Sequence, residues 1–475
     1  MSRNVEKEYV KLSPEQAVLH RPASYIGSIN STRIETWVPD TAGVMSHKMV
    51  EYNPGLWKIF DECVTNALDA SKRDSSVCNI KVKVDDDSFS VWNDGKMGIP
   101  IQIHKEHNVY VPELIFSHVH SSSNYDDDKK RVWAGTNGVG AKAAIIFSTS
   151  STIEVVNNKQ KYEQTFEDNL TKRSKPVISK TKEANSVLIK CLPDFKRFRM
   201  TSFASNMTIQ MMYKRVLEVA AMTSRTVSVF WNDTKLPVNS FESYIDLFIG
   251  KDRKEVPRVI IVDAPWTVGI CLSPIDGYSQ VSSVNGCTTF EGGSHVEHIV
   301  GPLVKQIAEK IQAKNKDVTI KPQYIRDNMM VFVDTELPNP KFSSQTKEKL
   351  ISTVREFSSR FEQSDDFVRK VEKLGIADNI LAIAKAKDIK NLKSSQRKKS
   401  RITDIPKLND ANKAGGAQSS KCTLILTEGD SAKSMALSGI QNRDLFGVFP
   451  LKGKLLNVRD VTAKKLSANV EIQSV

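Results

Sequence analysis

Three polar side chains on one predicted helix have the types and the spacing that phosphate chemistry requires. Glu62, Asn66 and Asp69 stand at positions i, i+4 and i+7 of Trp57–Ala70, a segment with a helical apolar period, so they project from one face. An Asn oxygen can coordinate Mg²⁺, while a Glu carboxylate can polarise a water for attack on a phosphate. Taken alone, this spacing is more often that of a solvated polar helix face.

A glycine-bearing turn follows a predicted strand and could form another side of the same site. Asn93 and Asp94 precede Gly95 and Gly98 in the run NDGKMGIP. Glycine lets a backbone approach a ligand closely, and an amide or a carboxylate beside it can read the edge of a base. Taken by itself, the run is interpreted more readily as an ordinary glycine-rich turn.

The second glycine-rich segment, AGTNGVGAK at 134–142, precedes the apolar helix predicted at Ala143–Phe147. Glycines before a helix present backbone N–H groups to a phosphate, and Lys142 adds a positive charge. The segment is not a Walker A loop, because Ala141 separates Gly140 from Lys142 and no Ser or Thr follows. It also lacks the parallel strand–turn–helix setting of a dinucleotide fingerprint. Phosphate binding is therefore the favoured interpretation.

The composition is that of a soluble chain of several domains. The 475 residues are 40% hydrophobic and 26% charged, which excludes a largely disordered chain, a collagen-like fibre and a coiled-coil rod. We expect no membrane span and no signal peptide, because no apolar run approaches about 20 residues and charges interrupt the N-terminal segment. Lys+Arg 68 against Asp+Glu 55 leaves a net charge of +13, which permits a polyanionic partner. Six scattered cysteines indicate reduced thiols inside a cell.

Two α/β regions are predicted to position these motifs. The first has a sheet covered by helices on one face, which fits the pattern better than a doubly wound fold, and its strands are predicted at Asn79–Val84, Phe89–Trp92, Thr152–Val156, Val187–Cys191 and Val227–Trp231. The second has strands at Arg258–Val262, Thr267–Leu272 and Met329–Val333 and a helix at Val296–Gln312.

The remainder of the chain changes character. Ala384–Ala417 is rich in Lys, Arg, Ser and Asn, with the basic run Arg397–Arg401, and is either a solvated linker or an arm that contacts phosphates. Lys421–Leu426 is predicted to be a buried strand that leads into Glu428–Ala432 (EGDSA).

In this order the motifs resemble a GHKL-type ATPase joined to its transducer and followed by the opening of a Toprim domain. That is the arrangement of the type IIA DNA topoisomerases, in their eukaryotic form. The resemblance runs from about Tyr9 to Val475 and is carried by Glu62 with Asn66, Asn93–Gly98, Gly135–Lys142, Gln345–Lys347 and Glu428–Ala432, with local agreement at Arg21-Pro22, Tyr25-Ile26-Gly27, Ser123–Asp128 and Gly447–Leu451. A heat-shock chaperone or a MutL-type protein shares the ATPase motifs but carries no EGDSA after the transducer.

The resemblance implies an α/β fold class with three parts. A GHKL (Bergerat) ATPase domain with an N-terminal strap would occupy residues 1–240, and a ribosomal-S5-like transducer domain residues 241–385. A basic linker (386–419) would lead to the start of a Toprim α/β domain (420–475).

The resemblance also implies roles for individual residues around ATP and Mg²⁺. Glu62 matches the general base, Asn66 the magnesium ligand and Asn93 the residue that reads adenine. Gln345, Thr346 and Lys347 match the transducer loop that reaches the γ-phosphate, with Lys347 counted among the catalytic residues. The nucleotide-contacting segments correspond to Ser122, Ser123 and Asn124, and to Gly135, Thr136, Asn137, Gly138, Val139, Gly140, Ala141 and Lys142.

Four further residues take roles only from the resemblance. Tyr9 sits where the family's strap reaches the partner subunit's nucleotide site, and Lys314 and Lys316 lie in a basic loop that would face DNA. Glu428 would belong to the Toprim magnesium site, which stays incomplete because the acidic D-x-D pair and the DNA-cleaving Tyr would lie beyond Val475. The family usually has one residue between the glycines of the adenine-side turn, whereas Lys96 and Met97 make two here.

The function implied is that of an ATP-hydrolysing dimerisation gate. In a type IIA topoisomerase such a gate drives one DNA duplex through a transient double-strand break in another; this chain would hydrolyse ATP without cutting DNA. The expected partners are double-stranded DNA and a second copy of the chain, and no membrane. The expected location is the nucleus, or the cytoplasm if the source is a large DNA virus. The alternative is a non-cleaving DNA clamp or a regulatory fragment that pairs with a full-length topoisomerase.

Overall fold

The computed structural model describes residues 9, 11–119, 121, 132–133, 135, 138–315, 320–377, 379–382, 405 and 407–452. The chain divides into two compact units, of which the first comprises Met1–Lys305 with Arg326–Leu374 and the second Gln306–Ile325 with Gly375–Val475. The basic run at 397–401 lies outside the described residues. Among the residues described, none of the helices combines the length and the apolar character that crossing a bilayer demands.

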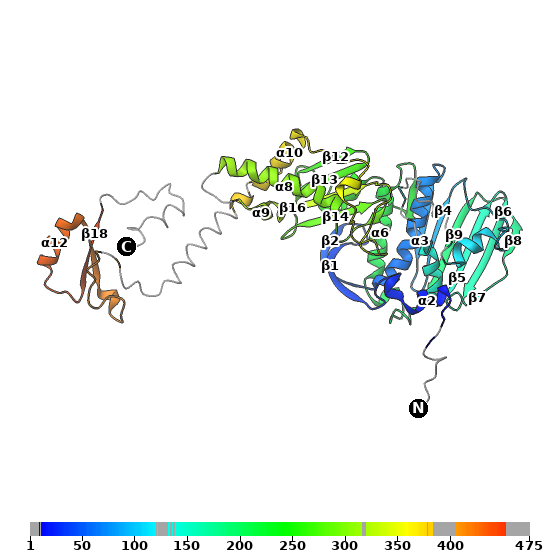
Figure 1. The fold of residues 1–475 in the computed structure, drawn as a ribbon, viewed down its shortest axis with the longest axis horizontal. Helices are drawn as coiled ribbons and strands as arrows, with labels where there is room; N and C mark the ends of the chain where they lie inside the picture. The colour runs from blue at the N-terminus through cyan, green and yellow to red at the C-terminus, as the bar shows by residue number, and fades with distance from the viewer. Residues whose placement is uncertain are drawn as a thin grey trace, which may run out of the picture. The chain divides into compact units, whose positions relative to one another are not determined.

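A nine-stranded sheet forms the larger part of the first unit, as far as the chain is described (Figure 1). β10 and β3 run parallel, while β3, β4, β9, β5 and β6 are antiparallel neighbours. In spatial order the strands are β11 (Thr234–Lys235), β10 (Ser228–Trp231), β3 (Asn79–Val84), β4 (Phe89–Asp94), β9 (Ser186–Pro193), β5 (Ser148–Asn157), β6 (Gln160–Glu167) and β7 (Lys172–Arg173), with β8 (Val177–Lys180) also paired to β6.

Helices cover one face of this sheet. Along β3, Ile80, Val82 and Val84 are buried and Lys81 and Lys83 are exposed, because successive side chains of a strand point to opposite faces. The buried side packs against three helices, α3 (Pro54–Arg73), α5 (Gly140–Ile146) and α6 (Thr208–Met222). The prediction of a one-sided helical layer, rather than a doubly wound fold, is confirmed.

Helix α3 begins at a capping residue that also anchors it to the surrounding chain. The side-chain oxygen of Asn53 accepts from the Leu56 backbone N–H at 3.0 Å, and Pro54 occupies the first turn, where it needs no donor. The Asn53 amide group donates to the carbonyls of Ile29 and Phe198. The helix therefore starts three residues before the predicted Trp57, since apolar periodicity does not reveal the cap.

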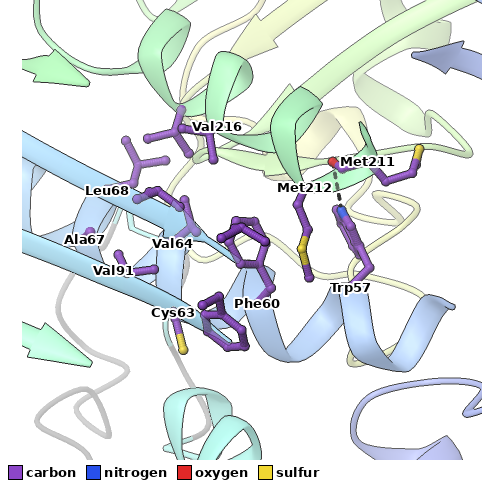
Figure 2. Close-up of a cluster of buried hydrophobic side chains, with 14 of the residues drawn as sticks. Trp57, Phe60, Cys63, Val64, Ala67, Leu68, Val91, Met211, Met212 and Val216 are labelled. Atoms are coloured by element: carbon purple, nitrogen blue, oxygen red, sulfur yellow. Dashed lines mark hydrogen bonds between the residues drawn. The ribbon is translucent and has the colours of Figure 1, made fainter. Parts of the chain in front are cut away.

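The apolar face of α3 is packed against α6 and the sheet. Figure 2 shows Phe60, Val64 and Leu68 in one buried cluster with Val216, and the indole N–H of Trp57 donates to the Met211 carbonyl at 3.2 Å. All three α3 side chains are fully buried. This packing fixes the rotation of α3 and hence the direction in which its polar residues point.

A five-stranded sheet completes the first unit within the described residues, together with α7 (Phe241–Ile249). The three strands predicted for this region are confirmed, and so is the long helix, which is α8 (Ser294–Lys314). The serine-rich run that forms β14 was missed, since it lacks the apolar alternation of a typical strand. The order is β12 (Arg258–Asp263), β13 (Trp266–Leu272), β16 (Met329–Thr335), β14 (Ser279–Val284) and β15 (Cys287–Thr288).

Side chains join the five-stranded sheet to a two-stranded hairpin and to α3. From the hairpin of β1 (Thr32–Pro39) and β2 (Met45–Tyr52), the Trp37 indole N–H donates to Ser279 Oγ in β14 at 3.0 Å. At the end of α3, Lys72 Nζ lies 2.6 Å from a Glu336 carboxylate oxygen.

The second unit contains β17 (Thr423–Glu428), α12 (Gly429–Gly439) and β18 (Phe446–Leu451), with the two strands parallel. The prediction that the first of these strands is buried is wrong, because Leu424 and Leu426 are each 40% exposed. Within the described residues, one helix and one neighbouring strand do not cover both faces of β17.

The short elements of the described chain complete the fold. They are α2 (Pro14–His20), α4 (Val111–Ser117), α9 (Pro322–Arg326) and α10 (Asp365–Val371), the 3₁₀ turns Pro22–Ser24, Phe203–Ser205, Val354–Glu356 and Ser419–Lys421, and a π turn at Glu372–Ile376.

Shortening a core side chain of α3 should destabilise the first unit. Val64→Ala removes two buried methyl groups and leaves a cavity, so we expect the free energy of unfolding to fall by about 2 kcal/mol. Val44→Ala is the matched control, because Val44 is 56% exposed, and its effect should stay within about 0.5 kcal/mol. Urea denaturation followed by tryptophan fluorescence measures both, and equal losses would contradict the packing described.

Candidate functional site

A cavity of about 620 Å³ brings together segments that are far apart in the sequence. It is lined by one face of α3, the turn after β4, the helix α4, the start of α5 and a loop that follows the five-stranded sheet. The predicted site residues that line it are Glu62, Asn66, Asn93, Gly98, Gly135, Gly138, Gly140, Ala141, Lys142, Gln345 and Lys347. The alternative interpretation of the α3 spacing was a polar helix face exposed to solvent. That alternative does not explain why these distant segments meet at one cavity.

Other predicted residues lie elsewhere. Val139 is buried in the core below the cavity, and Thr346 lines a neighbouring cavity of about 750 Å³. Tyr9 is 71% exposed and does not line the cavity of its own chain. The predictions for Ser122, Ser123, Asn124, Thr136, Asn137 and Lys316 lie outside the described residues.

Two predicted residues belong to the second unit. Lys314 is the last residue of α8 and is exposed. Glu428 ends β17 and precedes the first turn of α12, where its side chain is also exposed.

Glu62 is held in place by a lysine one turn earlier on α3. Lys58 Nζ lies 2.9 Å from Glu62 Oε1 and 2.7 Å from Asp61 Oδ2. Burial alone would lower the pKa of Lys58, but the charges of Asp61 and Glu62 outweigh it and raise that pKa well above its usual range. On the other side, a Cβ at Gly140 would overlap the Glu62 carboxylate. Glycine at this position therefore lets the second glycine-rich segment lie directly against Glu62.

A buried arginine on α6 completes the charge network. Arg215 Nε lies 2.6 Å from Asp61 Oδ1, and its Nη2 donates to Thr65 Oγ1 at 3.1 Å and to the Gly286 carbonyl at 2.7 Å. Burial opposes the charge of Asp61, yet Lys58 and Arg215 hold the pKa of this carboxyl well below its usual range. The network thus connects the helix of Glu62 to the β14–β15 turn in the five-stranded sheet.

The third polar residue of the α3 face fixes a loop. Asp69 is 2% exposed, and its Oδ2 accepts from the Gly135 backbone N–H at 2.9 Å. A buried carboxylate that accepts a backbone N–H is a strong positional restraint. The spacing singled out Asp69, but its bonding to the second glycine-rich segment was not predicted.

The turn after β4 accommodates two residues, Lys96 and Met97, between its glycines. Gly95 and Gly98 have φ angles of 144° and 54°, values that favour glycine. Between them, the Lys96 N–H donates to Ser76 Oγ and the Met97 N–H to Asp74 Oδ2, both at 2.7 Å. The two residues between the glycines are therefore absorbed by hydrogen bonds to the end of α3, and both glycines still line the cavity.

Asn93 and Asp94 have different surroundings at the end of β4. Asp94 Oδ1 accepts from the backbone N–H groups of Cys78 and Asn79, at 2.7 and 2.9 Å, and its Oδ2 accepts from the Asn79 side chain. Asp94 thus braces the strand end. Asn93, whose amide donates to the Asp94 carbonyl at 2.9 Å, lies beside it on the cavity wall.

The apolar walls of the cavity were missed by sequence reasoning. Strand residues such as Val187 and Ile189 have the same pattern as ordinary core residues, so no chemical signal marks them. The run VPELIF at the start of α4 could have indicated a further wall, because an apolar helix there follows the glycine turn. The apolar lining includes Ile99, Leu114, Ile115, Val187 and Ile189.

Two lysines bring positive charge to the cavity. Lys142 is 5% exposed, its Nζ donates to the Ser121 carbonyl at 2.7 Å, and burial lowers its pKa to about 8. Lys347 is 8% exposed and has a φ of 62°, in a turn closed by a 3.1 Å bond from its N–H to the Ser344 carbonyl. A cavity with carboxylates, amides, glycine backbone and cations suits a phosphorylated ligand with an apolar ring.

Comparison with known proteins agrees with this geometry. The family model described as DNA gyrase B matches residues 238–400. The chain is 44% identical to a DNA topoisomerase 2 of Drosophila melanogaster over 99% of this chain and 33% of that protein, and 40% identical to one from Acanthamoeba polyphaga mimivirus over 100% of this chain and 38% of that protein. The chain therefore spans about a third of the length of these curated relatives.

Solved structures show the same likeness in three dimensions. The ATPase region of Saccharomyces cerevisiae topoisomerase II matches with a TM-score of 0.74 and 35% identity, over 80% of this chain and 100% of that one. The ATPase and transducer domains of DNA topoisomerase II from Balamuthia mandrillaris match with a TM-score of 0.75 and 33% identity, over 82% of this chain and 100% of that one.

Removing the buried guanidinium should be far more damaging than removing an exposed one. Arg215→Met leaves the buried Glu218 carboxylate without its guanidinium partner and Asp61 with Lys58 alone, so we expect a loss of about 3–5 kcal/mol in the free energy of unfolding. Arg33→Met is the control, since the Arg33 side chain is 74% exposed although it pairs with Glu51 at 2.7 Å; its loss should be below about 1 kcal/mol. Similar losses in chemical denaturation of the two variants would refute the network.

Proposed function

This chain belongs to the DNA topoisomerase II family, and from that premise we propose that it binds and hydrolyses ATP as the dimerisation gate of a type IIA topoisomerase. The whole enzyme would pass one DNA duplex through a transient double-strand break in another. The observation that carries the proposal is the cavity shared by Glu62, the glycine-rich segments and Lys347. A remote loop that reaches the site of a phosphate offers a direct way to couple nucleotide state to domain position.

In this proposal Glu62 is the general base. Its carboxylate would orient and deprotonate the water that attacks the terminal phosphate, and Lys58, 2.9 Å away, would fix the carboxylate in place. Asn66, one turn further along the same face and also in the cavity, supplies an oxygen of the type that Mg²⁺ accepts. Magnesium, when bound, would neutralise charge on the phosphates.

Other residues would hold the nucleotide. Asn93 on the cavity wall would read adenine, with the apolar side chains around it enclosing the ring. The backbone of Gly138 and Gly140 and the Lys142 ammonium would contact the phosphates, joined by Ser122, Ser123, Asn124, Thr136 and Asn137. Gln345 and Lys347 would reach the γ-phosphate and tie the five-stranded sheet to the ATP-bound state.

The gate would work as a two-fold dimer around DNA. Tyr9 would extend into the nucleotide site of the second copy, which its 71% exposure allows. Lys314 and Lys316 would face DNA, and the net charge of +13 supports binding through phosphates without sequence reading. Glu428 would take part in a Toprim magnesium site together with residues of the whole enzyme. We infer a nuclear location, or a cytoplasmic one for a virus.

The division of the chain is part of the same proposal. We infer an ATPase domain to residue 240, a transducer to 385, a linker to 419 and the start of a Toprim domain thereafter. The separate sheets support this division, because β11 ends the first at Lys235 and β12 begins the second at Arg258. The start of the gyrase B match at residue 238, close to the proposed boundary at 240, supports the first division.

Measuring ATP hydrolysis per protomer over a range of protein concentrations tests the proposed function. We expect the rate per protomer to rise with concentration, because the closed site would need two chains. Glu62→Gln should still bind ATP but turn over at least about 100-fold more slowly, since it loses the base. Glu35→Gln, on an exposed strand of the β1–β2 hairpin, is the control. Normal turnover by Glu62→Gln would overturn the mechanism, and a flat, inactive profile would favour the regulatory-fragment alternative.

The affinity for ATP should depend on pH through Lys142. Burial lowers its pKa to about 8 in the free protein, and a bound phosphate would favour the charged form and raise that pKa. Binding should therefore take up a proton, and the affinity should fall as the pH rises through about 8. Titration calorimetry in buffers of different ionisation enthalpy measures this uptake. Lys142→Met should abolish the dependence, whereas Lys83→Met, at an exposed site on β3, should retain it.

A further inference from the structure

Three side chains outside the proposed nucleotide chemistry lie together on the loop between β4 and α4. One ligating atom from each of His104, Glu106 and His107 lies within 4.8 Å of the other two. The two imidazole rings are stacked, with centroids 4.8 Å apart and planes 25° apart. Within the described part of the chain, this is the one group of three or more His, Cys, Asp or Glu side chains that meets this separation.

The backbone of this loop is closed mainly by hydrogen bonds between its own N–H and carbonyl groups. Ile103 and Tyr110 form an antiparallel bridge, and the His104 N–H donates to the Val109 carbonyl at 2.8 Å. The His104 carbonyl accepts from the Asn108 N–H, also at 2.8 Å. The three side chains therefore project from a closed turn, so bringing them onto one ion requires side-chain rotation and little loss of backbone freedom.

We propose that His104, Glu106 and His107 bind a divalent transition-metal ion of the zinc class, with water completing the coordination. Two imidazoles and one carboxylate are the donor set of open zinc sites, whereas Mg²⁺ selects oxygen ligands and would not compete well here. Zinc bonds of about 2.0–2.1 Å require the ligand atoms to be closer together than they are now, and rotation about χ1 and χ2 supplies that movement.

The surroundings permit this movement. Glu106 and His107 are exposed and His104 is half-buried, so the ion reaches all three from solvent. One contact would be given up: the His107 backbone N–H donates to His104 Nδ1 at 3.4 Å, a length at which a hydrogen bond is weak. The loss is small compared with a metal–nitrogen bond.

The site is distinct from the cavity but connected to it along the chain. Ile99 and Pro100, before the loop, and Val111 and Leu114, after it, all line the cavity. An ion on the loop would thus restrain the link between two cavity walls.

Titration of the untagged chain with Zn²⁺ and Co²⁺, in the absence of nucleotide, tests this proposal independently of the proposed function. We expect one saturable ion per chain in calorimetry and visible absorption from bound Co²⁺. Loss of outer-shell partners typically costs ~10–100-fold in metal affinity, so loss of a direct ligand in His104→Gln or His107→Gln should cost at least as much. Glu106→Gln should weaken binding as well.

The matched controls are His20→Gln and His47→Gln, which change histidines on α2 and β2 and should leave the affinity unchanged. Thermal unfolding without metal should be the same for the three loop variants and the unsubstituted chain, because the loop residues are largely exposed, and this separates a lost site from a lost fold. Absence of saturable binding would overturn the proposal. So would an affinity in His104→Gln and His107→Gln equal to that of the controls.

Discussion

The buried ion pair between Arg215 and Asp61 is the interaction on which the rest of the first unit depends. Its 2.6 Å contact joins two helices that are 154 residues apart in the chain, and the same guanidinium reaches the Gly286 carbonyl of the five-stranded sheet. Charges buried this deeply are tolerated only where every partner is in place. The contact therefore requires α3, α6 and the β14–β15 turn to assume one relative arrangement.

This constraint explains the geometry of the cavity. Asp61 and Glu62 are neighbours on α3 and share Lys58, so the position of the cavity carboxylate follows from that of the buried pair. Asp69, two turns later, ties the second glycine-rich segment to the same helix. One helix thus sets the floor of the site and the approach of its loops, while glycine at position 140 avoids a clash between a side chain there and Glu62.

Much of this arrangement was readable from the sequence, and the reasons for the failures are physical. Periodicity revealed α3 and the alternating strands because each has one buried face. β14 was not predicted, because its serines form hydrogen bonds, such as the one that Ser279 accepts from Trp37, and give the strand no apolar pattern. The motif residues were found through their chemistry, but Arg215 was not, since the few charged residues of the largely apolar α6 give no indication of a partner so distant in the sequence. The burial of β17 was predicted wrongly, because the apolar composition of a strand does not reveal which other elements cover it.

The separation between Asp61 and Arg215 also has a consequence for the order in which the chain is made. At a synthesis rate of about 5–20 residues per second, a separation of 154 residues means that the guanidinium follows its carboxylate by roughly 8–30 s. Helix formation itself takes about a microsecond, so α3 can form, with Lys58 already beside Asp61, long before Arg215 is available. The face of α3 that packs against α6 therefore stays exposed to solvent until α6 has left the ribosome. The Gly286 carbonyl, which accepts a hydrogen bond from the same guanidinium, is synthesised later still.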